Sequence, residues 1–460
     1  MGLTLTGLML AMLLGALDQT IMAPALPAVA ASLGGLDQMP AVVTAYLVAA
    51  TVVMPVYGKL GDRYGRKPLM QAAIVIFVTG AVLCSVAGSM PQFVAFRALQ
   101  GVGGGGLMIG AQAIIGELVS PRERGRYLSL IGAAYIVAAV GGPLVGGLFI
   151  DTVGWRWIFA IYPPLGLLAL VVLSRTLHLP RPGARAPLDV AGALTLAVAV
   201  VGMVLLGQTG EPVYLAVAAV GAGAWLFTAR RAADPILPLR LFRDRGFAVP
   251  VAISFLIGFA LFGTITYMPA YLQIALGSTA TQAGLLVTAL MGGVLATTIV
   301  SGRLITRTGL YKPYPVVGAL LAALGLGLLA VAEGAAAIAA VMLLTGLGVG
   351  LVMQVMVLVA QNTVAHADLG TATSAVTFLR QIGASAGVAV VGALITLRLA
   401  GAGFAEAVPP VFAMMAPLLG VAFLLALALP VRPLRTRAHI ARQGGKAIVA
   451  GDAGTVGEAP

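Results

Sequence analysis

Charged residues are scarce in this chain. Asp, Glu, Lys and Arg together form 9% of its 460 residues, whereas hydrophobic residues form 60%. A soluble domain carries about 25% charged residues, because its surface must stay hydrated. A chain of this length with so little charge has no means of covering a large water-facing surface. The composition therefore excludes one large soluble core and indicates an integral membrane protein.

Cysteine and histidine are nearly absent as well. The single cysteine, Cys84, lies inside an apolar stretch, which excludes an intramolecular disulfide and a cysteine metal site. The three histidines, His178, His366 and His439, are far apart in the chain and fall in or beside expected loops. Because no metal-ligand spacing is present, we expect neither a metal ion nor a cofactor.

Long apolar stretches dominate what is present. They are about 20 residues long, enough to cross a bilayer as a helix, and short polar breaks separate them. Residues 1–10 contain no basic residue, so the first stretch is expected to be a retained helix and not a cleaved signal peptide. The sequence predicts fourteen membrane-spanning helices: 5–27, 41–60, 69–88, 92–115, 127–149, 158–177, 189–209, 213–229, 247–268, 282–302, 314–332, 336–359, 374–397 and 409–429.

The basic residues follow the alternation of these helices. With both chain ends placed in the cytoplasm, 23 of the 27 Lys and Arg residues fall on cytoplasmic segments, two lie within predicted spans, and only Arg156 and Arg398 fall on segments at the outer side of the membrane. The positive-inside rule describes such a distribution. The net charge of +12 is thus a topology signal, and because its residues form no contiguous patch, we expect no nucleic-acid partner. The predicted location is a bacterial cell (inner) membrane with both termini in the cytoplasm.

The two halves of the chain repeat each other. Residues 58–65 and 302–309 share a Gly-basic-Leu triplet followed by Arg and Gly, at an offset of 244. A glycine series that begins at Gly101 matches another that begins at Gly346, at an offset of 245. Parallel six-helix repeats occur in transporters that bind substrate between the two halves.

The predicted fold is an all-α membrane protein, in which two six-helix bundles flank two additional helices. The predicted divisions are an N-terminal bundle (1–178), two linker helices with an amphipathic cytoplasmic stretch (179–246), a C-terminal bundle (247–430) and a disordered cytoplasmic tail (431–460).

One loop combines glycines with an acidic residue and several basic ones. The segment GKLGDRYGRK at 58–67 resembles the loop motif between helices 2 and 3 of the major facilitator superfamily. The resemblance implies a conformational latch on the cytoplasmic face; the alternative is a basic loop that only sets the topology. The second copy has Thr306 where Asp62 stands, and we expect it to have lost the charge pairing. The predicted latch residues are Gly58, Gly61, Asp62, Arg63, Gly65, Arg66, Lys67 and Glu117.

Three more segments resemble motifs of this superfamily. Arg97 and the residues up to Gly103 resemble the helix 4 motif in which an arginine assists proton transfer. Residues 141–147 resemble the helix 5 motif of the antiporter branches, and residues 17–27 resemble the first-helix motif of the fourteen-helix drug:H+ antiporter family. The resemblance covers all of the chain except its tail. The residues assigned to the antiporter motif are Gly142, Pro143, Gly146 and Gly147.

Asp18 is the acidic side chain that falls well inside a predicted span. Burial disfavours a charged carboxylate, so Asp18 is suited to take up and release a proton. Arg97 has a similar predicted depth, and we assign both residues to proton coupling. A structural aspartate that bonds to a neighbouring helix is the alternative role for Asp18, and Glu117 is the alternative proton carrier.

These features favour a proton-coupled exporter of amphipathic or cationic drugs that works by alternating access. Export of a lipid, a siderophore or another metabolite in the same fold is the alternative. A membrane enzyme would need a nucleophile with a base, or a metal cluster, and a channel would not need Asp18 and Arg97. The expected partners are a small amphipathic substrate, protons and the lipid bilayer, with the chain as a monomer. The predicted cavity residues are Tyr46, Gln112, Tyr135, Tyr267, Gln354 and Gln361.

The distribution of basic residues generates a topological prediction. A reporter enzyme that is active only in the periplasm, fused after Pro430, should be silent, because both termini are expected in the cytoplasm. The same reporter fused near Arg156 should be active and serves as the control. An active reporter after Pro430 would contradict the predicted orientation.

Overall fold

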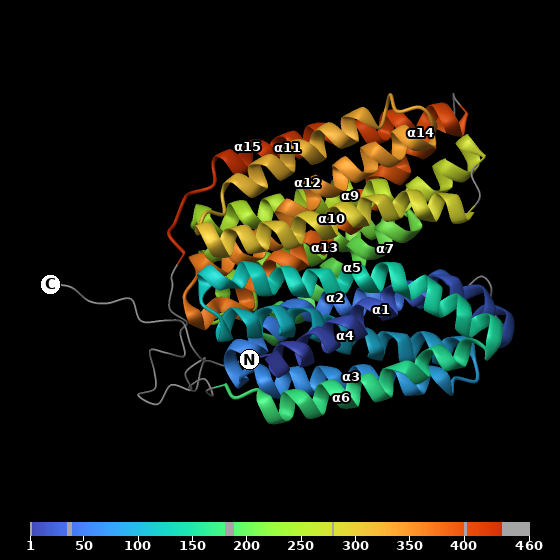
Figure 1. The fold of residues 1–460 in the computed structure, drawn as a ribbon. Coiled ribbons are helices and arrows are strands. Elements are labelled where there is room, and N and C mark those ends of the chain that lie inside the picture. The colour runs from blue at the N-terminus through green and yellow to red at the C-terminus, as the bar shows by residue number, and fades with distance from the viewer. Residues whose placement is uncertain (1, 35–38, 180–187, 278–279, 400–402, 435–460) are drawn as a thin grey trace.

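The computed structural model describes residues 2–34, 39–179, 188–277, 280–399 and 403–434, and these residues form helices joined by short connections. The predicted all-α class is confirmed. The helices run roughly parallel to one another along the length of the molecule (Figure 1). Most of the predicted tail, residues 435–460, lies outside the described residues.

The first group of helices lies in the lower part of Figure 1. In this group α3 packs between α4 and α6, and α1 packs against α5 and α6. Their bounds are α1 Gly2–Leu33, α2 Met39–Tyr64, α3 Arg66–Ser85, α4 Met90–Leu118, α5 Pro121–Thr152, the 3-10 helix η2 Trp155–Ile161 and α6 Tyr162–Thr176.

The second group occupies the upper part of Figure 1. In this group α13 packs on α9, and α12 packs on both α10 and α11. Their bounds are α9 Arg245–Leu276, α10 Ala280–Thr308, α11 Pro313–Leu328, α12 Gly334–Thr363, the 3-10 helix η4 His366–Asp368, α13 Leu369–Leu399, α14 Phe404–Ala413 and α15 Ala416–Leu427.

Two helices between the groups form a hairpin, α7 (Val190–Thr209) and α8 (Val213–Arg231). The Asp189 carboxylate accepts a hydrogen bond from the Gly192 N–H (2.7 Å) and caps the start of α7. Gly210 ends α7 with a φ of 70°, a conformation that glycine adopts at little cost. The hairpin packs against α2 of the first group and α13 of the second through α7. A 3-10 helix, η3 (Leu239–Arg243), then leads into α9.

The predicted count of fourteen membrane-spanning helices is wrong. Twelve helices among the described residues are long and apolar enough to cross a membrane. The two predicted spans outside this set correspond to α5 and α11. At 16 residues, α11 is about 24 Å long, less than the roughly 30 Å of a hydrocarbon core. The first turns of α5 carry Arg122, Glu123, Arg124 and Arg126, and several side chains of its apolar part, 127–149, lie outside the described residues.

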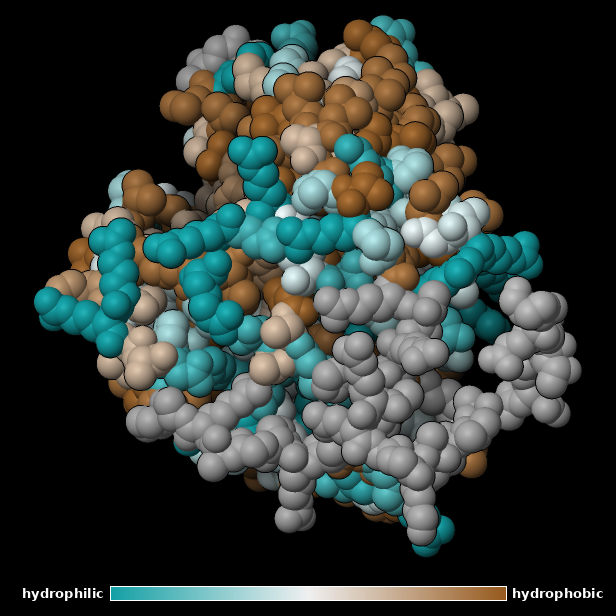
Figure 2. All heavy atoms as spheres, turned by 90° about the vertical axis from the view of Figure 1, so that its left-hand side faces the viewer, coloured by the Kyte–Doolittle hydropathy of each residue, from teal (hydrophilic) through white to brown (hydrophobic). Residues whose placement is uncertain are grey.

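The sequence repeat recurs in the backbone. The single residue between α2 and α3 is Gly65, whose φ of 95° lies in the region that favours glycine. Its counterpart in the second half, Gly309, directly follows α10 and has a φ of 75°. We call the end of the molecule that holds the α2–α3 turn the latch end; it lies at the left in Figure 1. Hydrophilic side chains gather across this end, as Figure 2 shows.

Helix α4 is packed closely from two sides because glycines line it. A Cβ atom on Gly101 would lie 2.5 Å from the Tyr46 carbonyl oxygen of α2, and one on Gly103 would lie 2.6 Å from Phe77 Cα of α3. Small residues permit this approach where helices pack in lipid. The packing holds the residues of α4 in fixed positions relative to α1 and α2.

The close approach at Gly103 generates a stability prediction. Gly103→Ala should destabilise the protein by about 1–3 kcal/mol, because the added methyl group forces α3 and α4 apart. Gly420→Ala is the control, since a Cβ there meets nothing within 4 Å. Thermal unfolding in detergent measures both variants, and an unchanged midpoint for Gly103→Ala would contradict the packing described.

Candidate functional site

A buried ion pair joins α1 to α4. The Arg97 Nη1 atom donates to both carboxylate oxygens of Asp18, at 2.8 Å each. Asp18 has no exposed surface, and Arg97 is 2% exposed. The Gln100 side chain completes the arrangement, because its amide nitrogen donates to Asp18 (2.9 Å) and its oxygen accepts from Arg97 (2.7 Å). Each charge therefore meets a partner of opposite charge or polarity, as buried charges require.

Aromatic rings enclose this pair. The Arg97 guanidinium lies over the Tyr46 ring, 4.5 Å from its centroid, which adds a cation–π contact. Tyr162 is fully buried, and its hydroxyl lies near Asp18. The Tyr46 ring reaches this place because Gly104 carries no side chain against it. The pair thus occupies an apolar shell in which a change of protonation would be strongly felt.

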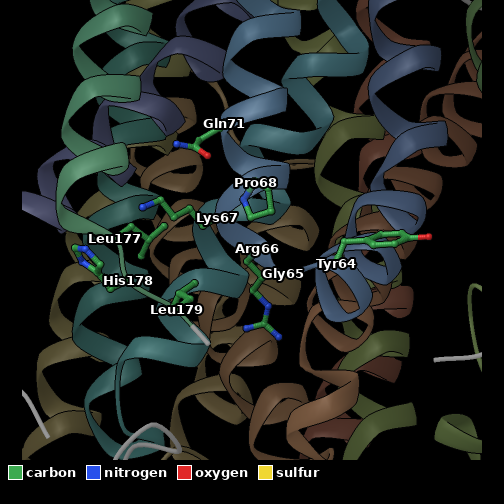
Figure 3. Close-up of a pocket in the computed structure, with 9 residues that line it drawn as sticks. All are labelled: Tyr64, Gly65, Arg66, Lys67, Pro68, Gln71, Leu177, His178 and Leu179. Atoms are coloured by element: carbon green, nitrogen blue, oxygen red, sulfur yellow. The ribbon is translucent and has the colours of Figure 1, made fainter. Parts of the chain in front are cut away.

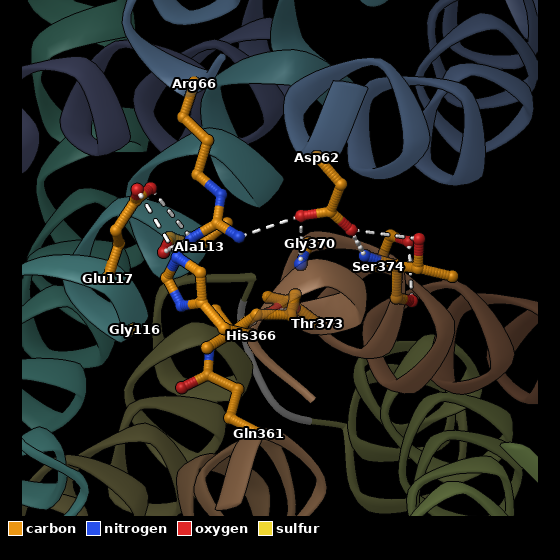
Figure 4. Close-up of polar contacts among 12 residues, drawn as sticks. Asp62, Arg66, Ala113, Gly116, Glu117, Gln361, His366, Gly370, Thr373 and Ser374 are labelled. Atoms are coloured by element: carbon orange, nitrogen blue, oxygen red, sulfur yellow. Dashed lines mark hydrogen bonds and ion pairs between the residues drawn. The ribbon is translucent and has the colours of Figure 1, made fainter. Parts of the chain in front are cut away.

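The latch motif fastens α2 of the first group to α13 of the second. Asp62 accepts hydrogen bonds from the backbone N–H groups of Gly370 and Thr371 (2.8 Å each) and from the Thr371 hydroxyl (3.0 Å). These N–H groups belong to the first turn of α13, where a carboxylate meets unsatisfied donors and the positive end of the helix dipole. Asp62 therefore caps a helix of the opposite half (Figure 4).

Arg66 extends this network to α4. Its Nη2 atom donates to Asp62 (2.8 Å), and its Nη1 atom donates to the Ala113 carbonyl (2.7 Å) and lies 3.2 Å from Glu117. The other Glu117 oxygen lies 3.7 Å from the imidazole of His366. Figure 4 shows Arg66 between the two carboxylates. Glu117 is thus placed in the latch network and far along α4 from Arg97.

Other residues of the 58–67 segment have separate contacts. Lys59, which was not among the predicted latch residues, pairs with Asp234 after α8, and Arg63 stacks on the neighbouring Tyr64 ring at 5.1 Å. A Cβ on Gly58 would lie 2.8 Å from the Gly370 carbonyl oxygen, so glycine at this position lets α2 meet α13.

A second seam between the halves lies at α5 and α10. The Arg122 guanidinium donates to the carbonyl oxygens of Thr306 (3.2 Å) and Arg307 (3.0 Å), which are in the last turn of α10. A cation at a helix C-terminus satisfies free carbonyls and the negative end of the dipole. Thr306 has the position in the second copy of the motif that Asp62 has in the first. In this second seam the charged group is Arg122, which belongs to the other half of the molecule.

Four predicted cavity residues lie in contacts between helices instead. Tyr46 stacks on Arg97, as described above. The Gln361 amide donates to the Gln112 carbonyl (3.2 Å) and to the Thr373 hydroxyl (2.8 Å), which ties α12 to α4 and α13. A Cβ on Gly132 of α5 would lie 2.9 Å from Gln354, so Gln354 also lies where the two halves meet. The side chain of Tyr135 lies outside the described residues.

A cavity of about 450 Å³ lies between α1, α2, α7, α9 and α13. Its wall combines amide and hydroxyl side chains with apolar ones, and no charged residue lines it in the described chain. Val388, for example, is 19 residues into α13, about 28 Å from the latch end. The lining residues are Gln19, Leu47, Val204, Gly207, Gln208, Phe262, Thr266, Tyr267, Gln381, Ala384, Ser385 and Val388.

Of the predicted cavity residues, Tyr267 lines this space, and its hydroxyl donates to the Val388 carbonyl (3.1 Å). Sequence reasoning did not select Gln19, which directly follows Asp18, or Gln208 of α7. A polar residue beside an intramembrane acid was a usable signal for Gln19. No pattern in the sequence pointed to Gln208, because it ends a helix that was assigned to the linker.

Another hollow, of about 480 Å³, lies at the latch end beside the α2–α3 turn. Lys67 donates to the Ser174 carbonyl (2.8 Å) and Gln71 to the Ser174 hydroxyl (2.7 Å), which fastens α3 to α6. Figure 3 shows Lys67 directed toward Leu177 and Arg66 directed away from it. The polar groups of this hollow thus serve the packing of the first bundle.

The helix 5 motif lies against α1 near the ion pair. A Cβ on Gly142 would lie 2.8 Å from Thr20 Cβ, and the Thr20 hydroxyl donates to the Ala138 carbonyl (2.9 Å). Gly142 and Gly146 are buried, whereas a Cβ on Gly147 would meet nothing within 4 Å. The side chain of Pro143 lies outside the described residues.

The Asp62 network generates a prediction about the latch. Asp62→Asn removes a charge from the start of α13 and should weaken the closed latch by about 1.5–3 kcal/mol. Ser374→Cys in a Cys84→Ser background reports opening, because Ser374 is fully buried beside Gly58. A maleimide should label this cysteine about tenfold faster or more when Asp62→Asn is added. Glu123→Gln, an exposed change at the same end, is the control; equal labelling rates would show that Asp62 does not hold the seam.

Comparison with known proteins agrees with this architecture. The sequence profile described as Major Facilitator Superfamily matches residues 8–388. An uncharacterized MFS-type transporter of Mycobacterium tuberculosis is 39% identical over 403 residues, which are 85% of this chain and 58% of the relative. Multidrug transporter protein MdtP of Bacillus subtilis is 33% identical over 409 residues, 86% of this chain and 75% of the relative. The chain thus spans less than two thirds of the length of the mycobacterial relative.

Solved structures share the fold at low identity. The proton:xylose symporter XylE superposes with a TM-score of 0.69 at 17% identity, covering 93% of this chain and 95% of the symporter. The human organic anion transporter MFSD10 (TETRAN) superposes with a TM-score of 0.70 at 18% identity, covering 92% and 99%. The comparisons reach the superfamily and not its fourteen-helix branch, and this chain belongs to the major facilitator superfamily of membrane transporters.

Proposed function

We propose that this chain is a proton-coupled secondary active exporter of amphipathic or cationic drugs. The observation that carries the proposal is the fully buried Asp18–Arg97 pair, one residue from the cavity wall. Successive residues of a helix point about 100° apart, so α1 presents Asp18 to α4 and Gln19 to the cavity. A proton on Asp18 and a substrate in the cavity therefore act on the same turn of one helix.

Protonation of Asp18 changes the balance of charge in the apolar shell. With Asp18 ionised, the pair is neutral overall, and both Arg97 Nη1 and the Gln100 amide donate to its carboxylate. A neutral Asp18 leaves the Arg97 charge with only the Tyr46 ring and the Gln100 oxygen, which is a costly arrangement in low dielectric. Movement of α1 against α4 that admits water from the cavity relieves this cost. Proton binding thereby favours a second conformation.

The two seams at the latch end supply the other half of the cycle. Asp62 holds α13, Arg122 holds α10, and both contacts close the latch end while the cavity lies farther along the bundle. Each is a charge on a helix end, worth about 0.3–2 kcal/mol. Contacts of this size are strong enough to bias one state and weak enough to be broken in each cycle, as rocking of two halves about a central site requires.

The cavity chemistry supports the substrate class. Amide and hydroxyl groups beside Phe262, Leu47 and Val204 suit a molecule with an apolar body and a few polar atoms. The nearest acid, Asp18, offers a negative charge when Arg97 moves away, which a cationic substrate would use in place of the proton. The name of the Bacillus relative, a multidrug transporter, points to the same class.

Asp18→Asn tests the coupling. The amide keeps a polar group near Gln100 but mimics a permanently protonated acid, so substrate-induced proton release from energised vesicles should fall by about tenfold or more. Binding and energy-independent exchange of a neutral substrate should remain in part. Asp151→Asn, an exposed change on α5, is the control. Proton release at the wild-type rate would place the proton carrier elsewhere, with Glu117 as the first residue to examine.

A further inference from the structure

The polar groups in the wall of the 450 Å³ cavity differ in how much of their hydrogen-bonding capacity is already used. Three hydroxyl groups in this wall donate to backbone carbonyl oxygens of the helices that form it. They belong to Thr266, Tyr267 and Ser385. The donors that remain for a molecule in the cavity therefore come from amide side chains.

Gln381 of α13 presents both polar atoms of its amide to the cavity. Its side chain is partly exposed, lines the cavity and makes no hydrogen bond with any described residue. A glutamine amide can accept through its oxygen and donate through its NH2 group. Gln381 thus offers a donor and an acceptor on one planar group.

Gln208 of the linker helix α7 adds a second donor. Its carbonyl oxygen accepts a hydrogen bond from the Thr44 hydroxyl of α2, which leaves the NH2 group as the free end of the amide. The Gln208 side chain is exposed and lines the cavity, so this donor is accessible to a bound molecule. Because α2 holds the oxygen, the amide is oriented before a substrate arrives.

Close packing of α7 on α13 brings these two amides to similar depths. A Cβ on Gly207 would lie 2.6 Å from the Ser385 carbonyl oxygen, so the missing side chain permits this approach. Gln208 directly follows Gly207, and Ser385 lies four residues beyond Gln381, a rise of about 6 Å along α13. The two amides therefore differ in height by about one helical turn on the wall of one cavity.

The charge of the wall narrows the kind of group that the amides can hold. Among the described residues, no acid or base lines the cavity, so neither an anion nor a cation would meet an opposite charge there. The carboxylate of Asp18, beside Gln19 in the chain, is fully buried and paired with Arg97. Taking an ion out of water costs far more than taking out an amide or a hydroxyl. The wall thus favours an uncharged polar group.

We propose that Gln208 and Gln381 are specificity-determining residues that together hold an uncharged hydrogen-bonding group of the substrate, such as an amide or a hydroxyl. The acceptor atom of that group meets the Gln208 donor, and the apolar wall around Phe262 receives the body of the molecule. The linker helix α7 is then part of the substrate site. This inference rests on the proposed export function and narrows its substrates to neutral amphipathic molecules.

Chloramphenicol, a neutral aromatic amide with two hydroxyl groups, serves as the probe. Its Kd is measured by equilibrium dialysis against the protein in nanodiscs, without a proton gradient. Gln208→Met and Gln381→Met keep the length of the side chain and remove its polar atoms, so each should weaken binding by about three- to tenfold. Gln92→Met is the matched control and should leave the Kd unchanged, because Gln92 is exposed on α4 and does not line the cavity.

Tetraphenylphosphonium, a bulky lipophilic cation without a hydrogen-bonding group, separates recognition of a polar group from the shape of the cavity. It should bind more weakly than chloramphenicol, and neither Gln208→Met nor Gln381→Met should weaken it further. An equal loss for both ligands would show that the two residues only shape the cavity, and would reject the proposal. Unchanged chloramphenicol binding in both variants, or no binding by the wild-type protein, would reject it as well.

The outcomes separate this inference from the export function on which it rests. Selective loss of chloramphenicol binding in a protein that shows no proton coupling would keep the amide site and remove the proposed coupling. Proton-coupled export of tetraphenylphosphonium, with chloramphenicol binding unaffected by Gln208→Met and Gln381→Met, would keep the exporter and reject the amide site.

Discussion

The free-energy cost of an unpaired charge inside a bilayer is the constraint on which the rest of this structure depends. Asp18 and Arg97 neutralise each other in an apolar shell, and Gln100 accepts a hydrogen bond from Arg97 and donates one to Asp18. Such a pair adds little net stability, because desolvation offsets most of the attraction, but removal of one partner is expensive. The pair therefore adds little to stability, but the loss of either charge would be costly, and this is the property that the proposed proton coupling requires.

Pairing of charges with helix ends also stabilises the contact between the two halves. In one seam a carboxylate, Asp62, meets the N-terminus of α13; in the other a guanidinium, Arg122, meets the C-terminus of α10. The repeated sequence predicts matching structures at these places, and the two positive-φ glycines do match. The charges do not match. In the first seam the charge is Asp62, on the helix that carries the motif, whereas in the second seam it is Arg122, on the helix that faces the motif copy, and it has the opposite sign. The two repeats thus share their backbone geometry at these turns, whereas the charged group differs from one seam to the other.

The hairpin between the halves shows how a linker becomes part of the cavity wall. Glycines on α7 and α8 let the two helices pack closely, as at Gly202 against Ala218, and Gly207 lets α7 approach α13. The result places Gln208 beside Gln19 and Gln381, which come from three separate parts of the chain. A helix of the pair that joins the two bundles thereby supplies one wall of the cavity.

Composition, helix positions, the repeat and the main motifs were readable from the sequence, because apolar length and local turn chemistry depend on neighbours in the chain. Every predicted span overlaps a helix, but fourteen was the wrong number, since twelve of the described helices are long and apolar enough to cross a membrane, and α5 and the short α11 are not among them. Depth along a helix also indicated that Asp18 and Arg97 lie at one level. Which way each side chain points was decided by tertiary packing: Tyr46, Gln112 and Gln361 turn into helix contacts, while Gln19 and Gln208 turn into the cavity. A uniformly apolar helix carries little amphipathic signal to tell its faces apart, so only the contacts between distant helices determine them.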